Sequence, residues 1–137
     1  KTCDRTFILI DNKERIQACK KKFKYDVDKI KGKKIILIDD TIVRGNVIRS
    51  IIDSLKLIGV SEIHVRIPAA PVIDICQLGI AIHNKEELLM HNRTISDVEK
   101  LLDIQSLNYL TFDELMLFSP YSYKQCFGGG IDCEIIN

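Results

Sequence analysis

The fold is decided by one stretch, residues 35–45, which reads IILIDDTIVRG from Ile35 to Gly45. Its first four residues are branched and apolar without alternation, which is typical of a strand buried on both faces of a parallel sheet. Two acids follow, and then a short loop that ends at Gly45. In open α/β sheets, ligands bind at the carboxyl ends of the strands. The stretch therefore predicts a buried parallel strand that carries a ligand-binding loop.

A helix and a second strand are predicted after the loop. The apolar residues that recur at helical spacing, and that form one stripe, are Val47, Ile48, Ile51, Ile52, Leu55 and Ile58. Gly59 is placed to end this helix. Residues 63–67 alternate between apolar and polar, as in a strand. With the turn at 31–34 before it, this order of strand, helix and strand predicts a parallel α/β unit.

The flanking segments are less regular, and we find no internal repeat and no clear linker. Short strands are predicted at 6–10 and 78–82, and a Lys-rich helix at 13–24. Three sequences resemble capping boxes, at Asn84 to Glu87, Ser96 to Glu99 and Thr111 to Glu114. They predict short helices near 85–91, 97–102 and 112–118. The tail is expected to be irregular from about residue 119.

Bulk composition suits a single globular domain. The chain has 137 residues, of which 46% are hydrophobic and 28% charged. No run approaches the roughly 18 to 20 apolar residues of a membrane span, and no charged stretch followed by an apolar one marks a secretion signal. Five cysteines at wide spacings, without a Cys-x-x-Cys pair, argue against a disulfide framework and for a cytoplasmic setting.

Charge is distributed unevenly along the chain. Residues 1–34 hold 12 Lys and Arg against 5 Asp and Glu, although the whole chain has a net charge of +1. The basic segment 20–24 is compatible with a nucleic-acid surface, with an ordinary solvated face, or with an anionic small substrate. Composition alone leaves these three readings open.

The loop itself carries the chemistry. Asp39 and Asp40 are costly to bury without partners, and a sugar diol, a Mg²⁺ ion, or both would satisfy them. Backbone N–H groups at the start of the following helix favour a phosphate, and Thr41 adds a hydroxyl donor. The plainer alternative is an acidic turn that merely caps the helix. The full string favours a loop that holds a ribose diol at one end and a phosphate at the other.

This string resembles the phosphoribosyl-diphosphate (PRPP) motif of type I phosphoribosyltransferases, and its ending is similar to that of the amidophosphoribosyltransferases. Further matching segments extend the resemblance over about residues 5–127: Arg5 to Ile8, Gly32-Lys33, His64 to Ile67, Pro71, Gly79-Ile80, Glu87-Leu88, Arg93 and Ser106 to Leu110. The resemblance implies a type I phosphoribosyltransferase-like parallel sheet flanked by helices and incomplete at its N-terminus. Residues 1–137 would then be the C-terminal part of that domain.

The family reaction is the transfer of ammonia to PRPP, which gives 5-phosphoribosylamine and diphosphate and opens purine synthesis. The resemblance implies Mg²⁺ as cofactor, a homo-oligomer, and a glutaminase domain that is absent here and is expected upstream or in another chain. No nucleic acid and no membrane are expected as partners. The implied substrate-binding residues are Asp39, Asp40, Thr41, Ile42, Val43, Arg44, Gly45 and Asn46. Asp39 and Asp40 would also hold the metal, and Arg5 would face the diphosphate as a catalytic residue.

The chain departs from the family pattern at several positions. Asn46 and Val47 replace two threonines, and Asp4 stands where glycine is usual. The loss of the hydroxyl donors predicts weaker PRPP binding. An iron–sulfur cluster is not expected, because Tyr123 stands where a cysteine would join Cys126.

Two further functional hypotheses stay open on the sequence alone. One is a non-catalytic module that binds PRPP or a nucleotide for regulation, which the departures at Asn46, Val47 and Asp4 favour. The other is a nucleic-acid-binding protein that uses the basic first third. We interpret His64 as a structural histidine in a strand, and His83 and His91 as surface residues.

Overall fold

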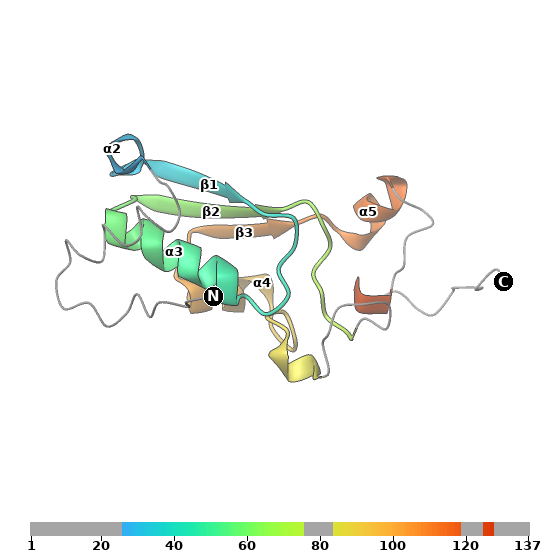
Figure 1. Cartoon of the computed structure of the whole chain (residues 1–137). Helices are drawn as coiled ribbons and strands as arrows, with labels where there is room; N and C mark the ends of the chain where they lie inside the picture. Colours follow the sequence, from blue (N-terminus) through green and yellow to red (C-terminus); the bar gives the residue numbers. More distant parts are fainter. Residues whose placement is uncertain (1–25, 76–83, 119–124, 128–137) are drawn as a thin grey trace, which may run out of the picture.

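A parallel three-stranded sheet forms the centre of the structure. The computed structural model describes residues 26–75, 84–118 and 125–127. The strands lie side by side in the order β1 (Lys34–Ile38), β2 (Glu62–Ile67) and β3 (Ser106–Tyr109), and both pairings are parallel (Figure 1). The predicted α/β class is therefore confirmed. The strands predicted at 6–10 and 78–82 and the helix predicted at 13–24 lie outside the described residues.

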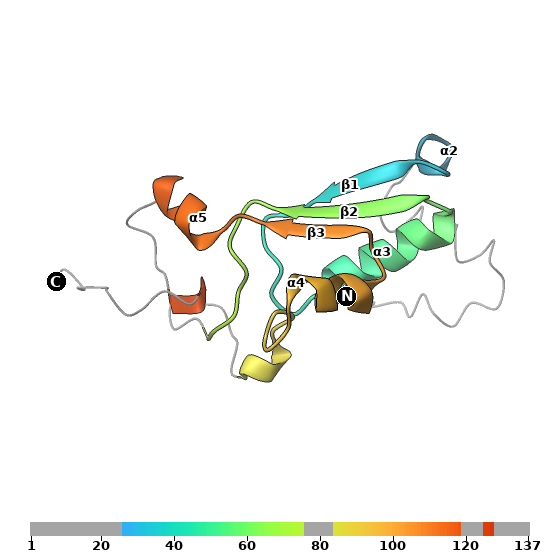
Figure 2. The same ribbon diagram turned by 180° about the vertical axis from the view of Figure 1, so that it is seen from behind.

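Helices flank this sheet. Those described are α2 (Val27–Ile30), α3 (Asn46–Ile58), α4 (Ile95–Leu102) and α5 (Phe112–Phe118), with 3-10 turns at Lys85–Glu87 and Gln125–Phe127. Both α3 and α4 lie on the same face of the sheet, as the opposite views in Figures 1 and 2 agree. In the described ranges, no helix is long and apolar enough to cross a membrane.

The helix predicted after the loop is confirmed as α3. Glycines in the left-handed conformation stand at both ends, Gly45 with φ 78° and Gly59 with φ 90°. Its apolar side chains Ile48, Ile52 and Leu55 are buried in the core with the strands, and Ile58 is buried at its last turn. Val47, however, is 69% exposed, so its predicted place in the apolar stripe is wrong. It lies in the first turn beside Ile48, and successive residues of a helix point in different directions.

The core lies between the sheet and the two helices. Its strand residues include Ile63, Val65, Ile67 and Leu107, which pack with buried side chains of α3 and α4. The alternation predicted for 63–67 is confirmed, because β2 alternates between half-buried and buried residues. Burial of this face is the main apolar contribution that holds α3 and α4 on the sheet.

β1 is not buried on both faces, contrary to the prediction. Ile36 is 65% exposed and Ile38 is 71% exposed, whereas Ile35 and Leu37 pack against the core. The reason is positional: β1 is an edge strand of the described sheet, and α3 and α4 cover only one face. The run of branched apolar residues thus predicted the strand correctly, but among the described residues no element covers its second face.

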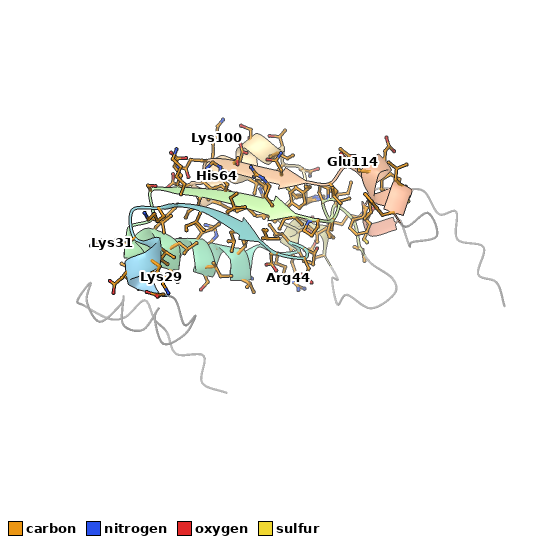
Figure 3. The ribbon with its side chains drawn as sticks, turned by 90° about the horizontal axis from the view of Figure 1, so that it is seen from above. Lys29, Lys31, Arg44, His64, Lys100 and Glu114 are labelled. Atoms are coloured by element: carbon orange, nitrogen blue, oxygen red, sulfur yellow. The ribbon has the colours of Figure 1, made fainter. Side chains whose placement is uncertain are left out.

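The second face of the sheet carries a polar network, which Figure 3 views from above. His64 Nδ1 lies 2.8 Å from the Ser106 hydroxyl, and its Nε2 lies 3.2 Å from a Glu62 carboxylate oxygen. Lys34 also pairs with Glu62 at 2.8 Å, and these hydrogen bonds, first from Lys34 and then from His64, lower the pKa of the Glu62 carboxyl. Arg66 donates to the same Ser106 hydroxyl at 2.9 Å. These contacts join all three strands, which supports the interpretation of His64 as a structural histidine.

Of the predicted capping boxes, the one at Thr111 forms and the one at Ser96 does not. At Thr111 the box is confirmed: its hydroxyl accepts from the Glu114 N–H, and the Glu114 carboxylate accepts from the Thr111 N–H. The box predicted from Ser96 is wrong, because Thr94 and Asp97 form the cap and α4 begins at Ile95. The Glu99 carboxylate instead accepts from the Leu107 N–H at 2.8 Å, which ties α4 to β3.

The helix predicted near 85–91 is a single 3-10 turn, Lys85–Glu87. Asn84 accepts from the Glu86 N–H, so the predicted start is correct. The turn stops because Leu88 is extended, with φ −73° and ψ 133°, and the Leu89 N–H donates to the carbonyl of Val43 instead of to this turn. A contact with the loop therefore replaces the rest of the predicted helix.

Candidate functional site

The loop from Asp39 to Gly45 lies at the carboxyl end of β1 and leads directly into α3 (Figure 1). Together with the first turn of α3 it lines an open pocket of about 460 Å³, formed by residues 39–48. This volume is within the usual range of small-molecule sites. All eight residues predicted to bind substrate in this loop, from Asp39 to Asn46, line that pocket.

Asp39, Asp40 and Thr41 form the acidic half of the loop. The Asp39 N–H donates to the Arg66 carbonyl at 3.3 Å, which continues the pairing of β1 with β2 by one residue. The Asp39 carboxylate accepts from the Asp40 N–H at 3.0 Å, and the Asp40 carboxylate accepts from the Thr41 N–H at 2.8 Å. One oxygen of each carboxylate is thus used locally. The second oxygen of each takes no part in these two bonds, and both residues line the pocket.

Ile42, Val43, Arg44 and Gly45 form the anchored half of the loop. Ile42 is 3% exposed and belongs to the main core. The Val43 carbonyl accepts from the Leu89 N–H at 2.8 Å, and the Val43 side chain packs against a second small core cluster. Burial and a backbone hydrogen bond therefore fix this part of the chain before any ligand arrives.

Arg44 and Gly45 contact the same neighbouring segment. The Arg44 Nε donates to the Glu87 carboxylate at 2.6 Å, and both side chains are close to half exposed. Gly45 has φ 78° and is buried, and a Cβ built there would lie 3.0 Å from a methyl group of Leu89. Both the left-handed backbone and the close side chain favour glycine at this position.

Residues 84–93, which we call the brace, support the loop from outside the motif. Leu88 is fully buried beside Val72 and Cys126. The Arg93 guanidinium donates to the carbonyl of Leu89 at 3.0 Å, which holds the bend in place. Lys85 at the start of the brace pairs with Asp74, and this hydrogen bond is the main cause that lowers the pKa of the Asp74 carboxyl.

The start of α3 completes the pocket. Within the described residues, no side chain caps this helix at Gly45. The N–H groups of a first helical turn have no partner inside their own helix, and the helix dipole adds positive potential there. Asn46 and Val47 are exposed at this turn and line the pocket. The arrangement can therefore hold an anion at the helical end and a cation or a diol at the acidic end.

Several predicted residues cannot be placed. Arg5, Asp4, Cys76 and Tyr123 lie outside the described residues, as does the basic segment 20–24. Among the described residues, no group of three or more His, Cys, Asp and Glu side chains is arranged to hold a metal ion. Mg²⁺ does not require such a cage, because it is usually held by one or two carboxylates together with substrate phosphates and water.

The brace is the part of the site that sequence reasoning missed. Glu87 and Leu88 stood out only as one more match to the family pattern, without a role. The contact of Glu87 with Arg44 spans 43 positions of the chain, so no local spacing could have revealed it. The sequence offered one hint of this contact, which is the opposite charge of Glu87 and of Arg44 inside the motif.

Comparison with known proteins identifies relatives over most of the chain. No protein-family model matches the chain. Proteins named amidophosphoribosyltransferase are similar to it over 112 residues, or 82% of the chain: that of Methanothermobacter thermautotrophicus is 38% identical and that of Rattus norvegicus 40% identical. The chain spans 24% of the former and 22% of the latter. It therefore corresponds to less than a quarter of the length of these relatives.

A solved structure has the same fold. It is the glutamine PRPP amidotransferase from B. subtilis complexed with ADP and GMP, which matches with a TM-score of 0.66 and 26% identity. The match covers 92% of this chain and 30% of the solved one. Sequence and fold thus agree on one relationship. The matched region of this chain is therefore the counterpart of a part of the phosphoribosyltransferase domain of the amidophosphoribosyltransferases.

Proposed function

We propose that the pocket formed by residues 39–48 binds PRPP, as part of an enzyme that transfers ammonia to PRPP. The observation that carries this proposal is the joint placement of two carboxylates and an uncapped helix start in one pocket of about 460 Å³. A phosphorylated pentose presents a diol and a phosphate, which match these two ends. The family relationship supports the same substrate, because the related proteins are named for it.

Each residue has a proposed role in binding. Asp39 and Asp40 accept hydrogen bonds from the ribose hydroxyl groups through the oxygens that are not used within the loop. The Thr41 hydroxyl, the backbone N–H groups from Ile42 to Gly45 and those at the start of α3 surround the 5-phosphate. Asn46 adds an amide at the same end. The anchored half of the loop holds these groups in place before the substrate binds, which lowers the cost of ordering them.

The donor set of the acidic half suits Mg²⁺. Asp39 and Asp40 offer carboxylate oxygens beside the pocket, and Mg²⁺ prefers oxygen ligands. When bound, the ion would neutralise charge on the diphosphate group. The residues of this chain contribute by binding and orienting the ribose and its 5-phosphate relative to the incoming ammonia.

The reaction replaces one bond at the anomeric carbon of ribose. A bond forms between the ammonia nitrogen and C1 while the bond from C1 to the diphosphate oxygen breaks, and diphosphate leaves with the electron pair. The nitrogen then releases a proton, which gives 5-phosphoribosylamine. The transition state carries positive charge on the sugar ring, and the nearby carboxylates of Asp39 and Asp40 stabilise such charge. In the whole enzyme a glutaminase domain would supply the ammonia.

One observation favours a second candidate, a PRPP- or nucleotide-binding module without catalysis. Val47 lines the pocket and is 69% exposed at the phosphate end, where it offers no hydrogen bond. The related structure from B. subtilis was solved with ADP and GMP, so nucleotides are a reasonable alternative ligand class. Binding and turnover must therefore be measured separately.

Calorimetric titration of the chain with PRPP and Mg²⁺ tests the proposal by measuring Kd. Denaturation with and without ligand measures stabilisation: at a free concentration of 100 times Kd, a specific ligand stabilises the folded state by about 2.7 kcal/mol. The double variant Asp39→Asn with Asp40→Asn should lose this stabilisation and keep the unfolding free energy of the unliganded protein. Normal PRPP binding by the double variant would refute the site. Formation of phosphoribosylamine from PRPP and ammonium then separates the enzyme from the binding module.

A further inference from the structure

We propose that Glu87 is a positioning residue for the loop: it orients Arg44 and, with the rest of the brace, holds the anchored half in the shape that binds phosphate. This inference rests on the proposed function for its ligand, but its structural part can be tested without any ligand. The Arg44 Nε donates to the Glu87 carboxylate at 2.6 Å, and a charge-assisted hydrogen bond of this length fixes the direction of a guanidinium group.

The geometry gives the brace two attachment points on consecutive parts of the loop. The side chain of Glu87 holds Arg44, and two residues later the Leu89 N–H holds the Val43 carbonyl at 2.8 Å. Between them, Leu88 is fully buried and fixes the spacing of these two contacts. Contacts at both Val43 and Arg44 restrict rotation of the peptide unit between them. A single contact would leave that peptide unit able to rotate.

The direction of the loop N–H groups depends on that restriction. Gly45 follows Arg44 directly and lies against Leu89, so the left-handed turn into α3 is formed against the brace. If Arg44 is released, the peptide units next to it can rotate and their N–H groups leave the pocket. The binding-competent shape then becomes one of several. The apparent Kd equals the intrinsic Kd divided by the fraction of molecules in the competent shape, so the affinity falls in proportion to that fraction.

The ion pair is not expected to contribute much to global stability. Arg44 and Glu87 side chains are 40% and 45% exposed, and pairs of this kind stabilise proteins little. This separates positioning from a purely structural role. A structural residue would lower the unfolding midpoint and affinity together, whereas Glu87 should change affinity while the midpoint stays nearly constant.

The test compares Glu87→Ala with Glu86→Ala, a matched control at the exposed neighbouring glutamate. Titration with PRPP and Mg²⁺ should show about a tenfold weaker Kd for Glu87→Ala and wild-type affinity for Glu86→Ala. Glu87→Gln keeps a carbonyl oxygen as acceptor and should recover part of the loss. In an Arg44→Ala background, Glu87→Ala should cause no further loss, because its partner is already absent.

Amide hydrogen exchange gives the readout that needs no ligand. In Glu87→Ala, peptides that cover residues 39–48 should exchange several-fold faster than in wild type or Glu86→Ala, while peptides from β2 and α4 stay unchanged. Unchanged exchange in 39–48 would overturn the inference, and so would a loss of affinity that the Arg44→Ala background does not remove. If wild type fails to bind PRPP but the exchange result holds, the proposed function falls and the role of Glu87 stands.

Discussion

The two halves of one loop are held in different ways. Within the described residues, the carboxylates of the acidic half bond to the next N–H groups along the chain, from Asp39 to Asp40 and from Asp40 to Thr41. The anchored half, by contrast, is held by residues more than 40 positions away, through Leu89 and Glu87. The carboxylates of the first half are thus held locally, whereas the second half is held by a distant segment before any ligand binds.

Ile42→Ala should lower the unfolding free energy more than any other variant proposed for this loop. Its side chain is 3% exposed in the main core, and truncation of a buried isoleucine typically costs about 2–5 kcal/mol of unfolding free energy. Thr41→Ala in the acidic half is the matched control, and we expect it to stay within about 0.5 kcal/mol of wild type. Urea denaturation measures both. Equal losses in the two variants would mean that the halves are not held differently.

Gly45→Ala should have the next largest effect, and on two quantities. A left-handed conformation costs an L-residue about 1–2 kcal/mol, and the new Cβ would also press on Leu89. Gly59→Ala is the control, because Gly59 has φ 90° at the other end of α3 and its Cβ would meet only Lys31 at 3.8 Å. Both variants should lose stability by denaturation, but only Gly45→Ala should also weaken PRPP binding in a titration. A similar loss of affinity in Gly59→Ala would remove the special role of the loop glycine.

Val47→Thr should have the smallest effect, a modest decrease in the Kd for PRPP. The side chain is 69% exposed at the phosphate end of the pocket, so a hydroxyl there can reach a bound phosphate without disturbing the core. One net hydrogen bond contributes about 0.5–1.5 kcal/mol, which tightens Kd by up to about tenfold. Val47→Ala provides the control for side-chain size. Identical affinity in wild type and Val47→Thr would place the phosphate elsewhere.

Periodicity predicted the elements that depend on local signals. Three of these predictions were correct: the strand at residues 35–38, the helix that ends before Gly59 and the strand at 63–67. They were correct because they depend on the spacing of apolar residues and on a glycine, which are close together in the sequence. β3 was not predicted as a strand. Its four residues, Ser106–Tyr109, are too few to give a period, and its position depends on pairing with β2.

The errors come from contacts between distant segments. Ile36 and Ile38 were expected to be buried, yet whether a second layer covers a strand is decided by other elements. The helix near residue 85 stops early because the Leu89 N–H donates to the Val43 carbonyl. The supporting role of the brace could not be predicted from the spacing of neighbouring residues. For the site, the motif predicted which residues line the pocket, from Asp39 to Asn46. It could not predict what holds them, since those partners lie in another part of the chain.

The separation of the motif from its brace has a consequence for biosynthesis. Glu87 follows Arg44 by 43 positions, so a growing chain exposes the whole motif well before its support has been made. Until the brace is synthesised, the nascent loop lacks its contacts with Glu87 and Leu89. A polypeptide that stops at Gly59 therefore contains the complete motif without the segment that supports it.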